Sequence, residues 1–350
     1  DAELSFEVRR ELHALGLFKN HLKALHDAFE DPEISEICVN RHDDIWIERG
    51  GTMTRLEGVV LPGIAVRSAV KTLASANHKD VHAVLDCRMP GVRVAAALEP
   101  VAIKGSALCI RKHARSGRRL EDYVRSGGFD CTDLEEVGPD DDPPPLERIR
   151  RGGSAVMEFL QWVIRQKRNV IVAGSTGSGK TTLLNAMLAE IPHSDRVLTI
   201  EDTAELKVVT PNHVGLEASP EMGITIRSLV KLALRFRPDR IWVGEVRGAE
   251  AYDLLDAMNT GHSGGCSIHA DSARLALSRL ESCVRMNPDA ATLPLPALRQ
   301  QIADSIRYVI YCARRGPRRG PEQILEVLGI GDDGNYRTRI LFDVRGRYES

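Results

Sequence analysis

Two different patterns of apolar and polar residues divide the chain. In the first part, apolar residues recur at helix spacing up to Asp31-Pro32, and short strand-like runs and a helical stretch over 64–77 follow. Gly50-Gly51 separates two of these runs, as a hairpin turn would. The predicted strands cover residues 36–40, 44–48, 52–56, 92–97 and 107–111. This mixture predicts a small α+β domain over residues 1–112.

In the second part of the chain, helical and strand-like patterns alternate. The expected helices cover residues 157–167, 180–190, 224–236 and 249–260, and the expected strands cover residues 169–173, 196–201, 240–245 and 266–269. Alternation at this spacing is typical of βαβ units, in which helices cover both faces of a parallel sheet. We therefore predict an α/β domain with a mainly parallel sheet over residues 153–350, ending in an antiparallel hairpin of 324–330 and 337–344.

Residues 113–152 form the predicted linker and carry abrupt changes of charge. Residues 111–125 are basic, residues 130–145 are rich in acids and prolines, and arginines return at 148–151. An acidic, proline-rich stretch cannot bury a core, so we expect a mobile loop there. We hypothesise that the charge of this loop modulates the coupling between the two domains.

Composition narrows the class of protein. The 350 residues are 43% hydrophobic and 27% charged, which excludes a disordered tail, a collagen and a disulfide scaffold. Forty-seven basic residues stand against 49 acids, so a basic nucleic-acid binder is disfavoured. No run approaches the roughly 20 apolar residues of a membrane span, and no signal peptide is recognisable, so we expect a cytoplasmic protein. The seven cysteines include no C-x-x-C pair and are expected to be reduced core thiols.

A phosphate-binding loop follows the first predicted strand of the second domain. Its sequence fits G-x-x-x-x-G-K-[ST] throughout. Glycines let backbone N–H groups surround phosphate oxygens, and the helix that begins there adds its dipole. Lys180 can reach the β and γ phosphates, and the Thr181 hydroxyl can ligate Mg²⁺. The predicted nucleotide-binding residues are Gly174, Ser175, Thr176, Gly177, Ser178, Gly179, Lys180, Thr181 and Thr182.

Two later strands end in acids. Glu201 ends the strand over 196–201, and Glu245 ends the strand over 240–245. Since ligands lie outside the carboxyl ends of parallel strands, both carboxylates should face the nucleotide. We predict that Glu245 is catalytic and that Glu201 supports catalysis on the metal side. Many phosphate-loop enzymes have Asp where this chain has Gly244, which makes a simple GTPase or switch protein less consistent with the sequence.

Histidines and arginines complete the candidate site. His262 and His269 flank a predicted strand and could hydrogen-bond a phosphate or a carboxylate, whereas no third ligand indicates a metal site. Hydrolysing motors commonly supply an arginine to the γ-phosphate. Arg93 and Arg111, on strands of the first domain, are candidates for it. A second group of arginines surrounds the Glu245 strand: Arg235, Arg237, Arg240 and Arg247.

The order of these motifs resembles the traffic ATPases of bacterial secretion, conjugation and pilus assembly. Segments 174–181, 199–206, 241–247 and 260–270 are similar to the family's phosphate loop, Asp box, Gly-Glu strand and His box, and the segment 31–40 is similar to its "DP…EI.VN" opening. The resemblance covers nearly the whole chain and is strongest to the conjugative type IV and tight-adherence pilus branches. The interval between the two histidines is one residue shorter than is usual in the family.

The resemblance implies a hexameric ring of RecA-like domains that binds ATP between the two domains of each subunit. It implies that Glu245 is the catalytic acid, that His269 lies near the phosphates, and that Arg93 and Arg111 contact phosphate. The implied partners are inner-membrane components of a secretion or pilus machine, with the ring peripheral at the inner face of that membrane.

Two other functions compete with a secretion or pilus motor. A DNA-translocating or helicase-type motor would need a broad basic or aromatic surface, which the sequence lacks. A dense basic patch at Arg314, Arg315, Arg318 and Arg319 is accounted for by a solvated hairpin, so direct nucleic-acid binding is not expected. A nucleotide-binding scaffold without hydrolysis would not need its carboxylates.

Overall fold

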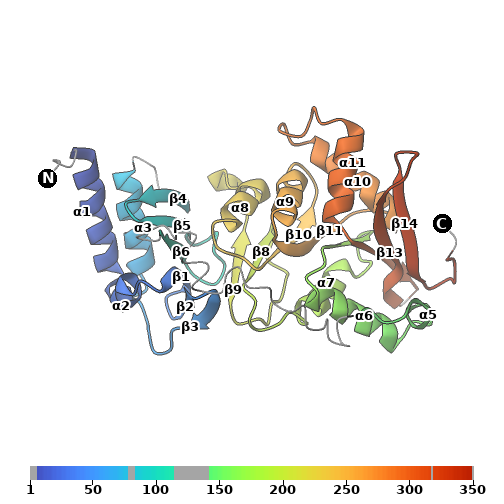
Figure 1. Ribbon diagram of the computed structural model, residues 1–350, viewed down its shortest axis with the longest axis horizontal. Helices are drawn as coiled ribbons and strands as arrows, with labels where there is room; N and C mark the ends of the chain where they lie inside the picture. Colours follow the sequence, from blue (N-terminus) through green and yellow to red (C-terminus); the bar gives the residue numbers. More distant parts are fainter. Residues whose placement is uncertain (1–5, 78–82, 114–141, 317, 349–350) are drawn as a thin grey trace, which may run out of the picture. The chain divides into compact units, whose positions relative to one another are not determined.

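The computed structural model describes residues 6–77, 83–113, 142–316 and 318–348, which fall into two compact units (Figure 1). The first unit comprises Asp1–Pro100 and Lys104–Asp142, and the second comprises Val101–Ile103 and Pro143–Ser350. Most of the predicted linker, with its acidic stretch up to residue 141, lies outside the described residues. Among the helices that the structure describes, none is long and apolar enough to cross a membrane.

The first unit is an antiparallel sheet with helices packed on one face. The strand order is β3-β2-β1-β6-β5-β4. The strands are β1 (Ile34–Arg41), β2 (Asp44–Arg49), β3 (Thr52–Arg55), β4 (Val84–Met89), β5 (Val92–Ala97) and β6 (Ala107–Lys112). Alternate residues such as Ile37 and Val39 enter a core that also contains Leu22, Leu25 and Leu73 from the helices. The α+β pattern expected here is confirmed, and β4 is a strand that the pattern did not predict.

The first helical stretch is divided. One helix was expected up to Asp31, but α1 (Phe6–His21) and α2 (His26–Glu30) are separated by a 3-10 turn over Lys23–Leu25. Leu22 and Leu25 are both fully buried beside this turn. The tighter turn therefore keeps apolar residues on the core side across the break. Helix α3 (Ala65–Ala76) begins and ends within one residue of the expected range.

The second unit is built on an eight-stranded mixed sheet of order β14-β13-β12-β7-β11-β10-β8-β9. Strands β12, β7, β11, β10, β8 and β9 run parallel, and β12, β13 and β14 pair antiparallel. The strands are β7 (Val170–Gly174), β8 (Val197–Glu201), β9 (His213–Glu217), β10 (Arg240–Val246), β11 (Ser263–Ile268), β12 (Tyr308–Arg315), β13 (Arg318–Ile330) and β14 (Tyr336–Asp343). The α/β class and the terminal hairpin are thus confirmed.

Helices cover both faces of this sheet, as the alternating pattern predicted. Figure 1 shows α8 to α11 on one face and α5 to α7 on the other. They are α5 (Leu146–Ile149), α6 (Ser154–Arg165), α7 (Lys180–Leu188), α8 (Ile226–Ala233), α9 (Glu250–Asn259), α10 (Ala273–Arg285) and α11 (Leu295–Ser305). On the α5–α7 face, Phe159, Trp162 and Leu184 pack against Val170 and Val172 of the central strand β7. This packing fixes the strand that precedes the predicted phosphate-binding loop.

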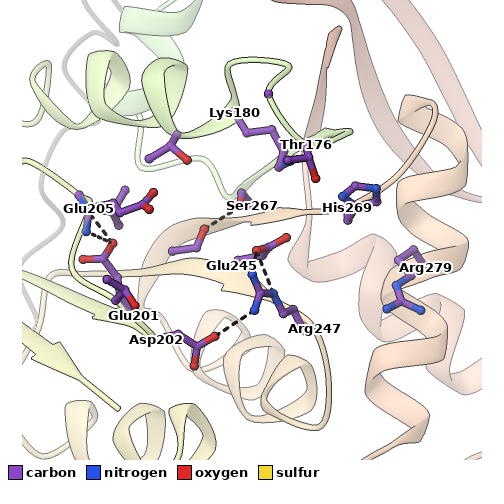
Figure 2. A pocket seen from close by; sticks show the side chains of 15 residues that line it. Thr176, Lys180, Glu201, Asp202, Glu205, Glu245, Arg247, Ser267, His269 and Arg279 are labelled. Atoms are coloured by element: carbon purple, nitrogen blue, oxygen red, sulfur yellow. Dashed lines mark hydrogen bonds and ion pairs between the residues drawn. The ribbon is translucent and has the colours of Figure 1, made fainter. Parts of the chain in front are cut away.

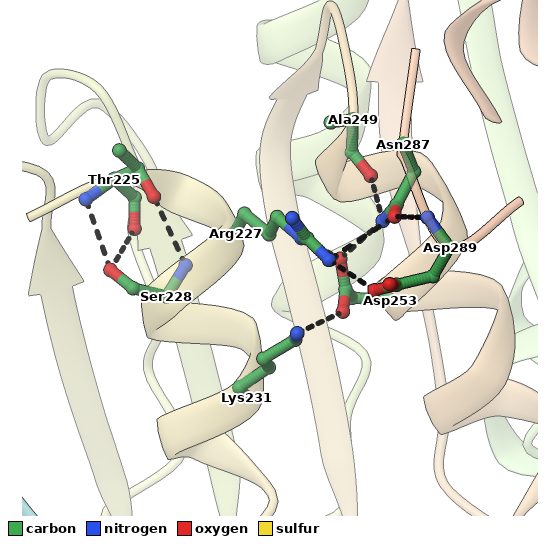
Figure 3. A network of polar contacts seen from close by, with 8 residues as sticks. All are labelled: Thr225, Arg227, Ser228, Lys231, Ala249, Asp253, Asn287 and Asp289. Carbon is green, nitrogen blue, oxygen red and sulfur yellow. Dashed lines mark hydrogen bonds and ion pairs between the residues drawn. The ribbon is translucent and has the colours of Figure 1, made fainter. Parts of the chain in front are cut away.

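An ionic network around the buried Asp253 joins α8 and α9 on the other face (Figure 3). Asp253 of α9 is 8% exposed and accepts hydrogen bonds from Arg227 of α8 at 2.9 Å and from Asn287 at 2.9 Å. Lys231 approaches the other oxygen of Asp253 at 3.3 Å, and Arg227 also bonds Asp289. Because a buried carboxylate is costly unless it is paired, this network fixes α8 against α9.

Residues 101–103 cover the outer edge of β9. The N–H of Ile103 donates to the carbonyl of Gly215 at 3.0 Å, and the N–H of Glu217 donates to the carbonyl of Val101 at 2.8 Å. Ala102 forms the antiparallel bridge with Leu216 between them. This short pairing protects an edge that would otherwise present unpaired backbone groups.

Candidate functional site

The carboxyl ends of β7, β8, β10 and β11 surround a cavity of about 630 Å³ (Figure 2). The cavity is lined by Lys180 and Thr181 after β7, by Glu201 at the end of β8, by Glu245 near the end of β10 and by His269 after β11. The structure thus brings together the strand-end residues that the sequence predicted at this edge of the sheet.

The loop between β7 and α7 depends on glycine. Gly177 and Gly179 have φ of 73° and 94°, in the left-handed region that side chains disfavour. A Cβ at Gly174 would lie 2.3 Å from the carbonyl oxygen of Cys312 and 2.5 Å from Oγ of Ser178. Ser178 itself is fully buried. The loop therefore adopts a compact backbone path that other residues would not permit at these points.

Lys180 closes this loop from inside. Its Nζ donates to the carbonyl oxygens of Gly174 at 2.8 Å and Ser175 at 3.0 Å. Burial lowers the pKa of the Lys180 amine, and the nearby charge of Glu245 partly opposes that shift. The ammonium group lines the cavity and is held there by two neutral carbonyl oxygens, which a negatively charged oxygen could replace.

Glu201 is buried and holds the segment that follows β8. Glu201 is 4% exposed, and its Oε1 accepts hydrogen bonds from the N–H groups of Glu205 and Leu206, both at 2.9 Å. Burial raises the pKa of the Glu201 carboxyl, while these two hydrogen bonds act in the opposite direction. A Cβ at Gly244 would lie 2.9 Å from Cγ of Glu201. The Glu201 side chain thus fills the space that a side chain at position 244 would need.

Glu245 lies in a β-bulge. In the pairing of β10 with β11, Val243 faces Cys266 and Val246 faces Ile268, so β10 has one extra residue in between. Ser267 donates its hydroxyl to the carbonyl of Gly244 at 2.6 Å, which satisfies an acceptor within the bulge. Bulges change the direction of a side chain and are common beside active sites. This irregularity accounts for the position of the Glu245 carboxylate in the cavity.

Arg247 holds one oxygen of this carboxylate. Its Nε and Nη2 donate to Oε2 of Glu245 at 2.9 and 2.6 Å, and its Nη1 lies 3.6 Å from Asp202. Both guanidinium donors use the same oxygen of Glu245 (Figure 2). The other arginines predicted around this strand do not line the cavity. Arg240 begins β10 and is paired with Asp195 in the core, and Arg235 and Arg237 precede that strand.

The two histidines lie at opposite ends of β11. His269 follows the strand and lines the cavity, whereas His262 precedes the strand and lies 3.2 Å from the carbonyl of Ala257 in α9. A six-residue strand spans roughly 20 Å at about 3.3 Å per residue. The structure therefore brings His269 to this cavity and does not bring His262 there.

Arg93 and Arg111 lie in the first unit and are direct neighbours across β5 and β6. Arg93 makes a two-pronged ion pair with Asp86 at 3.0 and 2.7 Å. Arg111 donates its Nε to buried Glu36 at 2.6 Å. The two guanidinium groups thus share one face of the first sheet, and a carboxylate holds each of them.

Comparison with known proteins decides the family. Residues 150–315 match the family described as Type II/IV secretion system protein. A type IV secretion system protein PtlH homolog of Bordetella bronchiseptica is 35% identical over 325 residues, covering 88% of this chain and 93% of its own. The chain belongs to the type II/IV secretion system protein family.

Other members of this family agree in sequence and fold. The type IV secretion system protein VirB11 of Brucella suis is 33% identical over 307 residues, or 83% of this chain and 84% of its own. The crystal structure of the VirB11 ATPase from the Brucella suis type IV secretion system, in complex with sulphate, matches with a TM-score of 0.80 and 30% identity. It covers 90% of this chain and 95% of its own. The resemblance inferred from the motif order is confirmed.

Ser267 and Arg279 also line the cavity, and the sequence did not single them out as site residues. Ser267 precedes His269 by two residues. Its hydroxyl donates to the carbonyl of Gly244 in the bulge of the neighbouring strand β10, a contact that the sequence does not indicate. Arg279 lies on α10 and lines the cavity beside His269 (Figure 2). The helical period over residues 273–285 would have placed Arg279 near this edge of the sheet, since that helix directly follows β11.

Proposed function

We propose that the chain is the ATP-hydrolysing motor of a type IV secretion machine, with a RecA-like catalytic domain over residues 153–350 and an N-terminal domain over residues 1–112. One observation carries the proposal most directly. A phosphate-loop lysine, Lys180, and a carboxylate in a β-bulge, Glu245, line one cavity at the carboxyl edge of the sheet. The secretion role rests on relatives named as type IV secretion proteins PtlH and VirB11.

The residues of the cavity fit a nucleotide with magnesium. The loop is so compact at Gly174 that a Cβ on this residue would collide with the carbonyl oxygen of Cys312 and with Oγ of Ser178. The buried Oγ of Ser178 has no hydrogen-bond partner among the described residues. Such a loop offers backbone N–H groups to phosphate oxygens. Thr181 and Glu201, which line the same cavity, offer the oxygen ligands that Mg²⁺ prefers. When bound, Mg²⁺ neutralises charge on the β and γ phosphates.

The cavity residues divide the work of hydrolysis. Lys180 exchanges its bonds to the loop carbonyls for β- and γ-phosphate oxygens. Glu245 orients a water toward the γ-phosphorus and accepts its proton, while the bond from that phosphorus to the ADP oxygen breaks. Arg247 occupies Oε2 of Glu245, so Oε1 is the oxygen assigned to the water. His269 lies on the γ-phosphate side of this arrangement.

Arg93 and Arg111 are proposed as further phosphate contacts supplied by the N-terminal domain. Their support is the family resemblance, together with their direct pairing across β5 and β6. Each arginine would exchange its carboxylate partner, Asp86 or Glu36, for phosphate oxygens. Arginine forms such bidentate bonds to either anion.

The proposed assembly is a hexameric ring at the cytoplasmic face of the inner membrane, working on membrane components that other chains supply. Native mass measurement with and without a non-hydrolysable ATP analogue tests the ring. A mass of one or two subunits under both conditions would contradict it.

The catalytic proposal is tested with Glu245→Gln in the full chain. We expect kcat for ATP hydrolysis to fall about 100-fold or more, because the general base is lost, while ADP binding is retained. Glu190→Gln, which changes an exposed acid in the turn after α7, is the matched control, and its ATP hydrolysis should be unchanged. Normal hydrolysis by Glu245→Gln would refute the assignment. Strong stimulation of the wild type by single-stranded DNA would favour the helicase-type alternative instead.

A further inference from the structure

A cluster of polar side chains lies on the face of the first sheet that is turned away from its helices. Glu36 and Cys38 are two residues apart on β1, so both side chains point to the same face. In the pairing of β1 with β6, Arg111 lies opposite Glu36 and Cys109 lies opposite Cys38. The intervening Ile37 points to the other face and belongs to the core beneath the helices. Two strands that are distant in sequence thus bring a carboxylate, two thiols and a guanidinium group together.

The carboxylate and the two thiols of this cluster touch one another. Sγ of Cys38 lies 3.3 Å from Sγ of Cys109, and the Cys109 thiol donates to Oε2 of Glu36 at 3.2 Å. The two sulfur atoms are not joined in a disulfide bond. Cys38 is fully buried, and Cys109 and Glu36 are 1% and 3% exposed. The two sulfur atoms and a carboxylate oxygen therefore form a compact triangle, in which all three lie within 4.8 Å of one another.

This triangle has nearly the dimensions of one face of a tetrahedral zinc site. Zinc binds thiolate sulfur at about 2.3 Å and carboxylate oxygen at about 2.0–2.2 Å. With tetrahedral angles, these bonds place two sulfur ligands about 3.8 Å apart, and a sulfur and an oxygen about 3.5–3.6 Å apart. The observed separations of 3.3 and 3.2 Å are each shorter by about half an ångström or less. Small side-chain rotations would therefore open the triangle enough to hold the ion.

The charges of the cluster also suit a divalent ion. A Zn²⁺ ion bound by two thiolates and one carboxylate leaves one net negative charge. Arg111 offsets this charge, because its Nε donates to Oε1 of Glu36 at 2.6 Å, which is the oxygen that the Cys109 thiol does not use. A buried cluster that is neutral as a whole costs much less than an unpaired buried charge. The Arg111 side chain is 49% exposed, so Glu36 lies one side chain below the surface and an ion has a short path to it.

We propose that Glu36, Cys38 and Cys109 form a zinc site in the first unit, in which Oε2 of Glu36, the two sulfur atoms and a water bind the ion. Two thiol protons pass to solvent as Zn²⁺ binds, and no electron is transferred. Thiolates select a soft or borderline ion, whereas Mg²⁺ prefers oxygen ligands. Arg111 holds the other oxygen of Glu36 and so orients the carboxylate toward the ion. Zinc binding here requires no nucleotide and is independent of the proposed function.

The first test is a titration of the reduced, metal-free, full-length chain with Zn²⁺ against a chromophoric chelator. Nucleotide is left out, because Arg111 is also a proposed phosphate contact. We expect one Zn²⁺ ion per chain at this site, which excess Mg²⁺ should not displace. Cys38→Ser and Cys109→Ser should each weaken Zn²⁺ binding at least about 100-fold, and Arg111→Gln about tenfold. Cys87→Ser, which changes another buried cysteine on the helix side of the same sheet, is the matched control and should bind Zn²⁺ normally.

Co²⁺ provides a second measurement, which uses the wild type and so does not depend on the stability of a variant. Co²⁺ bound by thiolates has an intense sulfur-to-cobalt charge-transfer band in the near ultraviolet, which oxygen and nitrogen ligands alone do not give. The wild-type chain should show this band, and added Zn²⁺ should remove it. Absence of the band, or unchanged Zn²⁺ affinity in both cysteine variants, would overturn the inference. Formation of a Cys38–Cys109 disulfide in air despite excess Zn²⁺ would also overturn it, because bound metal protects its thiolate ligands from oxidation.

Discussion

Gly244 and Glu201 compete for one space, and this competition can be measured. In the substitution Gly244→Ala, the new Cβ would lie 2.9 Å from Cγ of Glu201 and 3.2 Å from its Oε1. Neither side can yield easily, because Glu201 is buried and its Oε1 holds the N–H groups of Glu205 and Leu206. We expect the carboxylate to be displaced and the segment after β8 to loosen.

The magnitude follows from the contacts that change. Forcing a methyl group into a packed site costs about 1–3 kcal/mol, and each weakened hydrogen bond to the carboxylate adds to that loss. For a unit of this size, about 1 kcal/mol lowers the melting temperature by roughly 2–4 °C. Gly244→Ala should therefore lower the melting temperature of the second unit by several degrees. It should also reduce ATP hydrolysis, since Glu201 lines the cavity.

A double-mutant cycle isolates the cause. In a Glu201→Ala background the nearest remaining atom to the Cβ at position 244 is Cβ of residue 201, at 3.5 Å, which is an ordinary contact. Gly244→Ala should therefore add less than about 0.5 kcal/mol to the destabilisation caused by Glu201→Ala. Gly248→Ala, whose Cβ would meet its nearest neighbour at 3.4 Å, is the matched control. Equal loss of melting temperature from Gly244→Ala in both backgrounds would refute the steric argument.

Three further predictions concern the same cavity. Ser267→Ala removes the hydroxyl that satisfies the carbonyl within the β10 bulge, so kcat should fall roughly tenfold with little change in ADP affinity; Ser263→Ala, at the other end of β11, is the control, and equal effects in steady-state kinetics would contradict the role of the bulge. His269→Ala should lower ATPase activity severalfold and His262→Ala should leave it unchanged, and an assay with the reverse outcome would reject the placement of the pair. Burial raises the pKa of the Glu201 carboxyl above its ordinary value of 4.5, so the folded protein keeps this proton to higher pH than the unfolded chain does. Glu201 therefore makes the free energy of unfolding fall as the pH rises above 4.5. Glu201→Gln should flatten that dependence in chemical denaturation at several pH values, and an unchanged slope would exclude Glu201 as its source.

Local signals were sufficient to predict which residues line the candidate site at this edge of the sheet. The predicted phosphate-binding loop combines a short motif, an apolar strand before it and a helix after it, and β7 and α7 begin and end within two residues of the expected ranges. Glu201 and Glu245 were found because each follows an apolar run, and parallel strands bring such ends together. These inferences needed no knowledge of distant contacts.

Features that depend on distant contacts could not be predicted. Strand β9 contains Gly215 and a buried histidine, His213, whose ring hydrogen-bonds Thr199 at 2.9 Å, so its sequence lacks the usual strand pattern. Cys38 and Cys109 are 71 residues apart in sequence, yet their sulfur atoms lie 3.3 Å apart across β1 and β6. Neither strand by itself indicates which partner it will face.

The histidines illustrate the same limit in a different way. Both were expected to reach a phosphate or a carboxylate because they flank one predicted strand, but the two ends of a strand lie at opposite edges of its sheet. The expected strand began at residue 266, whereas β11 begins at Ser263 and includes Gly264 and Gly265. A Cβ at Gly264 would lie 1.7 Å from the carbonyl oxygen of Ile241, so these glycines are required by close strand contact rather than by a turn. The longer strand places His262 at the opposite edge of the sheet from His269.

Position 244 has no acid, yet the site still contains a carboxylate close to that position. An Asp there is common in phosphate-loop enzymes, and its absence was evidence against a simple switch protein. In this fold the neighbouring strand β8 supplies Glu201 to the same space, and a side chain at 244 would collide with it. Gly244 is therefore needed to leave room for the Glu201 carboxylate, so the site still has a carboxylate although position 244 has none. If this exchange is correct, Gly244→Asp together with Glu201→Gly should recover more ATPase activity than Gly244→Asp alone. A double variant that is no more active would mean that the hydrogen bonds of Glu201 to Glu205 and Leu206, and not the position of its charge, are what the site requires.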